Sequence, residues 1–142
     1  MPASLNSYQR QFCDIQGRLF ELSSKRGFDS QDFIKKFMNS KTCENMDLPY
    51  DRLQWSGEEY ILEELLEETI VKPVGERYSD EELFWTGYIY RYWHFLSGES
   101  GQDIYSQAKA DRMRDCYLGL HTLDVVMAIE DLKEIHRQEI SH

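Results

Sequence analysis

Apolar residues recur at spacings of three and four along most of this chain, and only an α-helix gathers such a pattern onto one face. The first instance lies between Ser7 and Arg26. Its apolar residues are Tyr8, Phe12, Ile15, Leu19 and Leu22. No stretch alternates apolar and polar residues as a half-buried strand requires, and no Asn-Gly or Asp-Gly hairpin signal occurs. The sequence therefore predicts an all-α protein.

Capping residues divide this pattern into separate helices. Gly27 follows two cations and ends the first helix, and Asp29 or Ser30 caps the second. Ser56 and Ser79 each precede a glutamate by three residues, which is the capping-box pattern at the start of a helix. The other predicted bounds are approximate. The helix that follows Ser56 ends near residue 71, and the helix that follows Ser79 ends near residue 96. Short helices are predicted over 42–47, 100–109 and 110–120, and a last helix begins at Thr122 or Asp124 and frays near Arg137.

The length of 142 residues predicts one domain. Apolar residues make up 41% of the chain, and a chain near 150 residues buries roughly 70% of its extended-chain surface. Short connections favour antiparallel neighbours. We therefore expect residues 1–142 to form a single-domain antiparallel helical bundle, with about five main helices and one or two short ones.

Signals for membrane insertion, export, cofactor binding and catalysis are missing from the sequence. No window approaches 18 consecutive apolar residues, and the first residues lack the basic and apolar regions of a secretory signal. Cys13, Cys43 and Cys116 are too widely spaced for a cysteine-only zinc site, and their odd number argues against a disulfide framework. Phosphate loops, metalloprotease motifs and nucleophile elbows do not occur. We expect a cytoplasmic protein with no cofactor, no metal site and no assigned catalytic residue.

The net charge of −10 is concentrated in one segment. Residues 58–82 hold ten acidic residues against Lys72 and Arg77, a net charge of −8. The candidate partner-binding acids on the helix predicted there are Glu59, Glu63, Glu64, Glu67 and Glu68. Like charges one turn apart cost roughly 0.2–0.5 kcal/mol per pair. The pattern is consistent with a solvated face, with ion pairs to the rest of the fold, with a divalent-cation site, or with a docking surface that steers a basic partner.

Seven of the twelve residues from Phe84 to Phe95 are aromatic, so the helix predicted there is apolar almost all round. Such a helix is usually central in its domain, although interfaces are also enriched in Tyr and Trp. Trp85 and Trp93 are the candidate anchors for a partner if their rings are exposed. Arg91, in the same segment, is interpreted either as a structural ion pair or as a ligand contact.

An alternative interpretation places a ligand-binding or catalytic pocket inside the bundle. Arg91, His94 and His121 could line it, provided that folding brings them together. No sequence spacing links them, and His121 is also suited to bond backbone groups beside a helix end. A structure in which Arg91 and a histidine face one solvent-reachable pocket would support this alternative. A structure in which a carboxylate and aromatic rings enclose Arg91 would argue against it.

Two stretches, Pro49–Tyr60 and Trp85–His94, resemble a family of small bacterial proteins of unknown function. The segments His121–Asp124 and Ala128–Leu132 fit the same family, so the resemblance is spread over residues 49–132 of the chain. Members are often associated with toxin-like genes, which implies an antitoxin or accessory role. The family offers no catalytic motif, so the resemblance assigns no site residue.

These observations favour a non-enzymatic, antitoxin-like interaction module over an enzyme. The expected partner is a more basic protein, with a toxin as the case that the family resemblance implies, bound through the acidic helix and exposed aromatic anchors. The carboxylates would then occupy a cationic site meant for phosphate or nucleic acid. Direct nucleic-acid binding is not expected, because phosphate affinity depends on Lys and Arg. The sequence is also compatible with a homo-oligomer.

Overall fold

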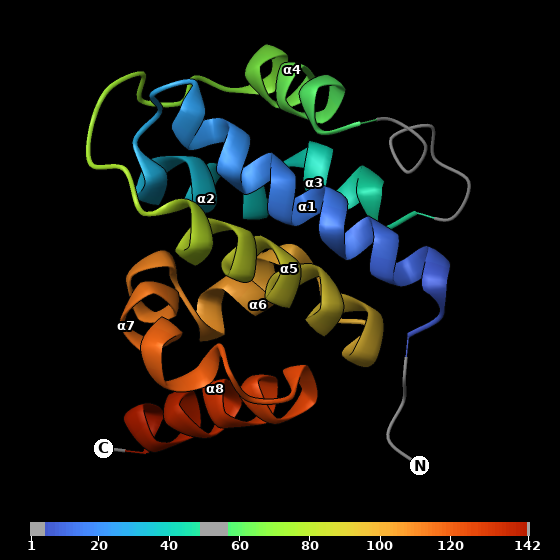
Figure 1. Ribbon diagram of the computed structural model, residues 1–142, viewed down its shortest axis with the longest axis vertical. Coiled ribbons are helices and arrows are strands. Elements are labelled where there is room, and N and C mark those ends of the chain that lie inside the picture. The colour runs from blue at the N-terminus through green and yellow to red at the C-terminus, as the bar shows by residue number, and fades with distance from the viewer. Residues whose placement is uncertain (1–4, 49–56, 142) are drawn as a thin grey trace.

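The computed structural model describes residues 5–48 and 57–141, and within these ranges the regular elements are all α-helices (Figure 1). The longer helices are α1 (Ser7–Lys25), α4 (Glu58–Glu68), α5 (Asp80–Ser97), α7 (Ala110–Leu120) and α8 (Val125–Ile140). The shorter helices are α2 (Ser30–Met38), α3 (Lys41–Met46) and α6 (Gly101–Gln107). The predicted all-α bundle is confirmed. None of the helices in the described ranges combines the length and apolar character that a membrane span requires.

Most helix ends lie at the predicted capping residues. Ser79 and Glu82 form the expected capping box: Ser79 Oγ accepts a hydrogen bond from the Glu82 N–H at 3.2 Å, and Glu82 Oε1 accepts one from the Ser79 N–H at 3.0 Å. Asp29 caps α2, and Gly98 ends α5 in the left-handed conformation with φ of 76°. These bounds follow from local chemistry that the sequence displays directly.

Helix α4 differs from its prediction at both ends. Its N-cap is Gly57, which has no side chain to accept a capping hydrogen bond, and the helix ends at Glu68 rather than near residue 71. Ser56, the predicted cap, lies outside the described residues, as does most of the Pro49–Tyr60 stretch.

Helices α1 and α5 run antiparallel through the centre of the molecule (Figure 1). Two glycines allow them to approach closely. A Cβ atom on Gly17 would lie 2.7 Å from the Phe84 ring, and one on Gly87 would lie 2.6 Å from the Gln16 carbonyl oxygen. Gln16 Nε2 also donates a hydrogen bond to the Gly87 carbonyl at 3.0 Å. These contacts set the distance and the register of the central helix pair.

The aromatic segment forms most of α5, and its side chains divide between the core and the surface. Tyr90 and Trp93 are buried in the single hydrophobic core that the helices share. Phe84, Trp85 and Tyr88 project from a different side of α5 and are only half-buried. Helix α5 is therefore both the centre of the core and the base of a surface feature.

Glu99, just after α5, joins α5 to α6 and α8. Its carboxylate accepts hydrogen bonds from Trp93 Nε1 at 3.0 Å, Gln107 Nε2 at 2.5 Å and Lys133 Nζ at 2.8 Å. Desolvation opposes the charged form, but these hydrogen bonds outweigh it and lower the pKa of Glu99 to about 2. The ionised carboxylate therefore holds the C-terminal helix against the rest of the bundle.

Candidate binding groove

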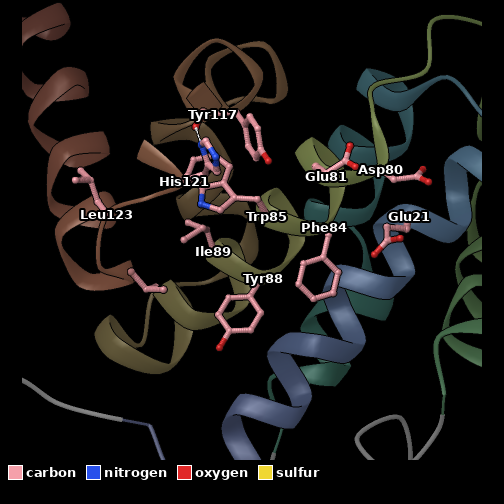
Figure 2. Close-up of a pocket in the computed structure, with 11 residues that line it drawn as sticks. Glu21, Asp80, Glu81, Phe84, Trp85, Tyr88, Ile89, Tyr117, His121 and Leu123 are labelled. Carbon is pink, nitrogen blue, oxygen red and sulfur yellow. Dashed lines mark hydrogen bonds between the residues drawn. The ribbon is translucent and has the colours of Figure 1, made fainter. Parts of the chain in front are cut away.

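A groove of about 680 Å³ opens between α1, α5, α7 and the segment that joins α7 to α8 (Figure 2). Helix α5 forms its base with Phe84, Trp85, Tyr88 and Ile89. The other lining residues are Glu21, Asp80, Glu81, Tyr117, His121, Leu123 and Val125. The volume is within the roughly 300–1,000 Å³ that ligand-binding clefts occupy. We take this groove as the candidate functional site.

Three carboxylates gather at one side of the groove, Glu21 from α1 and Asp80 and Glu81 from the first turn of α5 (Figure 2). The register of the central helix pair explains this arrangement. Gly17 lies against Phe84, so one turn forward along α1 and one turn back along α5 bring Glu21 and Asp80 together. The acidic side of the groove is thus a direct consequence of how α1 and α5 pack.

Like charges on these three carboxylates lie close together. Burial at the groove raises the pKa of Glu21. Lys25 and Arg18 oppose this shift, whereas Asp80 and Glu81 add to it. Within residues 5–48 and 57–141, no ion pair involves any of the three carboxylates. A bound cation would relieve this repulsion.

The rest of the groove is aromatic and fixed by ring contacts. Phe84 and Tyr88 stack with centroids 6.1 Å apart, and Trp85 meets Tyr117 edge to face at 5.7 Å. His121 stacks on Tyr117 at 4.2 Å, and its Nδ1 lies 2.7 Å from the Tyr117 carbonyl oxygen. Because a carbonyl can only accept, His121 Nδ1 carries the proton of this hydrogen bond. The ring positions are therefore set before a ligand arrives.

Carboxylates beside aromatic faces suit an organic cation. The π faces attract positive charge, the carboxylates pair with it, and the apolar surface accepts attached methylene groups. Among the described residues, no group of three or more His, Cys, Asp and Glu side chains is arranged to hold a metal ion. The expectation that no cofactor is needed stays a prediction.

The acidic helix α4 presents part of its predicted docking face. Glu59, Glu63 and Glu67 are exposed, each one helical turn from the next. Glu64 is half-buried and interacts within the chain. Three of the five predicted acids therefore form an exposed row along α4.

Glu68 has a structural role instead. Its carboxylate accepts hydrogen bonds from the backbone N–H groups of Lys41 at 2.7 Å and Thr42 at 2.9 Å, and from the Thr42 hydroxyl at 2.8 Å. Desolvation opposes its charge, but these bonds outweigh it and lower the pKa of Glu68. Glu68 therefore caps the start of α3 and is not part of the proposed docking face.

The two candidate tryptophan anchors have different environments. Trp93 is fully buried, with its indole N–H bonded to Glu99 and the Lys133 ammonium 5.6 Å from its ring centroid. This burial corrects the expectation that Trp93 offers an exposed anchor, because its ring is needed in the core. Trp85 is half-buried and lines the groove, where a ligand can reach it.

Arg91, His94 and His121 do not converge on one pocket. Arg91 is 2% exposed, donates to Asp47 at 2.5 Å and lies with its guanidinium carbon 5.3 Å from the Phe12 ring centroid. His94 lies beside the same carboxylate, with Nε2 3.6 Å from Asp47 Oδ1. His121 instead lines the groove, whose described lining includes neither of the others. A carboxylate and an aromatic ring thus enclose Arg91, as expected of a structural ion pair.

Sequence reasoning did not identify Glu21, Asp80 or Glu81 as site residues. Asp80 and Glu81 are fully explained as acids in the first turn of a helix, and no local motif surrounds Glu21. One usable signal existed. Gly17 and Gly87 stand within long helices, where glycine is unfavourable, and this indicates a close helix crossing.

The chain matches no family model, no curated protein and no solved structure. The resemblance to toxin-associated bacterial proteins therefore stays a prediction.

Proposed function

We propose that this protein is a non-enzymatic interaction module that binds a basic segment of a partner protein in the groove. The observation that carries the proposal is the juxtaposition of half-buried aromatic rings with the carboxylates of Glu21, Asp80 and Glu81, which form no ion pair within the described residues. Aromatic side chains supply much of the binding energy at protein interfaces. Rings that are already fixed lose less conformational entropy on binding.

The exposed glutamates of α4 add a second acidic surface. Glu59, Glu63 and Glu67 attract a basic partner over distances up to the Debye length, about 8 Å at physiological salt. In this proposal α4 steers the encounter and the groove retains the partner. The two contributions are separable, because steering changes the association rate whereas buried contacts change the dissociation rate.

The test begins with capture of partners from the native lysate on the full chain, followed by binding kinetics with each captured protein after purification. The steering variant combines Glu59→Lys, Glu63→Lys and Glu67→Lys, and the anchoring variant is Trp85→Ala. We expect the first to lower the association rate about tenfold at low salt and little at high salt. We expect the second to raise the dissociation rate about tenfold or more.

A matched control reverses the same number of charges elsewhere, at the exposed positions Asp115, Glu130 and Asp131. All variants are first compared with the wild type for helicity and unfolding. The control should affect association much less than the α4 variant does. The proposal fails if every captured protein binds the Trp85→Ala variant as well as the wild type, or if the control and the α4 variant behave alike.

The resemblance to toxin-associated proteins extends the proposal to a specific partner, a toxin in the bacterial cytoplasm whose cationic site the carboxylates occupy. The captured partner expressed alone should then arrest growth, and co-expression of this protein should restore it. The Trp85→Ala variant should restore growth less well. A partner that is harmless on its own would overturn the antitoxin-like role and leave the interaction module standing.

The alternative of a small helical enzyme or ligand-binding protein built around Arg91, His94 and His121 has less support. Arg91 is enclosed by Asp47 and Phe12, and His121 lies in the groove without it. Among the described residues, Arg91, His94 and His121 do not line a common pocket where they could contact one substrate.

A further inference from the structure

We infer that the acidic side of the groove receives an arginine side chain of the partner, in preference to a lysine. The inference rests on the proposed function and names the group that the groove recognises. The guanidinium pairs with Glu21, Asp80 and Glu81, and its plane and methylene groups lie against the aromatic base.

A guanidinium fits carboxylates beside aromatic rings better than an ammonium does. It is planar, so it stacks on a ring while the N–H groups in its plane donate to several carboxylates. It is also more weakly hydrated, which lowers the cost of leaving water. Glu21 is half-buried, so a cation that pairs with it must lose part of its hydration.

Elsewhere in the chain, carboxylates beside an aromatic ring already bind an arginine side chain. The guanidinium carbon of Arg114 lies 4.6 Å from the Tyr78 ring centroid, and its nitrogens lie 3.1 Å from Glu76 and 3.9 Å from Glu82. Glu82 is the residue after Glu81, so neighbouring acids of one helical turn serve two sites. One site is filled by an arginine of the chain, and the groove has no Lys or Arg among its described lining residues.

The cation–aromatic contacts of this chain differ in the number of carboxylates that pair with the cation. Arg91, beside Phe12, pairs with one carboxylate, Asp47, and Lys133, beside Trp93, pairs with one, Glu99. Arg114 pairs with two carboxylates. The groove presents three, contributed by two helices, which matches the several in-plane donors of a guanidinium.

The test titrates the purified full chain with three capped tripeptides, acetyl-Leu-Arg-Leu-amide and its counterparts with lysine or citrulline at the centre. Citrulline keeps the shape of arginine and removes the charge. Binding is followed by the NMR signal of the Trp85 indole N–H, assigned with a Trp85→Phe variant, and the buried Trp93 provides an internal reference. We expect a saturable Trp85 shift with the arginine peptide, binding of the lysine peptide about fivefold weaker, and no binding of the citrulline peptide.

A Glu21→Gln variant separates recognition from structural support. We expect it to weaken binding of the arginine peptide about three- to tenfold. Its thermal stability should be equal to that of the wild type or higher, because the folded state disfavours the charge at this position. Glu130→Gln, an exposed substitution outside the groove, should change neither property. A loss of both stability and binding in Glu21→Gln would instead mark Glu21 as structural.

The outcomes distinguish this inference from the proposed function. Equal binding of the arginine and citrulline peptides overturns cation recognition, and equal binding of the arginine and lysine peptides overturns the preference for a guanidinium. If none of the three peptides causes a saturable shift of the Trp85 signal, the inference is overturned. The proposed function still holds in that case if a captured partner dissociates faster from the Trp85→Ala variant than from the wild type. Selective arginine binding without any partner that distinguishes the variants upholds the inference and overturns the proposed function.

Discussion

At the scale of single residues, two glutamates show opposite effects of the fold on a carboxylate. Hydrogen bonds from three helices or their ends favour the charge of Glu99 and lower its pKa to about 2. Burial and acidic neighbours disfavour the charge of Glu21 and raise its pKa. The first carboxylate stabilises the fold at neutral pH, and the second reduces stability at a place where a ligand could compensate.

The lowered pKa of Glu99 predicts how stability depends on pH. Because the folded value of about 2 lies below the unfolded value of 4.5, the contribution of Glu99 is complete above about pH 5 and is lost as the pH falls toward 2. We expect Glu99→Gln to lower the free energy of unfolding by roughly 2–3 kcal/mol at pH 7. The difference from the wild type should shrink steadily between pH 5 and pH 2.5, as measured by denaturant unfolding.

The exposed substitution Glu130→Gln is the control for this experiment. Its unfolding free energy should follow that of the wild type at each pH. If Glu99→Gln differs from the wild type by a constant amount across the same range, ionisation of Glu99 is not the source of the stabilisation.

At the scale of the helix, the sequence predicts what depends on near neighbours. Ser79 begins α5 and Gly98 ends it because capping groups act on backbone atoms within one turn. Helix α4 is less predictable. It ends at Glu68, where the side chain turns to cap α3, a helix that comes earlier in the chain. Contacts of that kind leave no periodic trace in sequence, so the end of α4 could not be read from it.

The two central glycines give an element-scale prediction. Alanine is about 1 kcal/mol better than glycine inside a helix. At Gly87, however, the added methyl group would meet the carbonyl oxygen of Gln16 on α1 at 2.6 Å, and backbone cannot move aside cheaply. We therefore expect Gly87→Ala to destabilise the protein by about 1–3 kcal/mol, measured as the free energy of unfolding.

Gly119→Ala is the matched control within α7. Nothing lies within 4 Å of a Cβ atom built there, so the helix propensity of alanine should dominate. We expect an unchanged stability or a gain of up to about 1 kcal/mol. Equal effects of the two substitutions would contradict the close packing of α1 against α5.

At the scale of the whole molecule, the helices differ in how deeply they are embedded. Helices α1 and α5 make the most extensive contact, whereas α8 lies at one end of the bundle against α5 and α6 (Figure 1). We expect α1 and α5 amides to exchange hydrogen only when the whole protein unfolds. Amides of α8 should exchange through local opening at a free energy at least about 1–2 kcal/mol lower, measured by native-state hydrogen exchange with increasing denaturant. One common value for α5 and α8 would show that they unfold together.

The same scale explains why the sequence could not reveal the groove. Its acidic side joins Glu21 to Asp80, and its far wall adds His121 from a third helix end. Periodicity identifies the faces of each helix but not which faces meet. Arg91 shows the same limit: the aromatic pattern predicts that its segment is central, but nothing in the sequence indicates its partner Asp47, which lies 44 residues away.

Because α5 is both the base of the groove and the middle of the core, the two cannot be altered independently. A substitution that reshapes the base near Ile89, a fully buried residue, also disturbs packing that holds the helices together. Substitutions at exposed rim positions such as Glu81 and His121 do not disturb this core packing. New specificity would therefore be acquired most cheaply at the rim, and libraries for engineering a different ligand should vary those positions and leave the aromatic base intact.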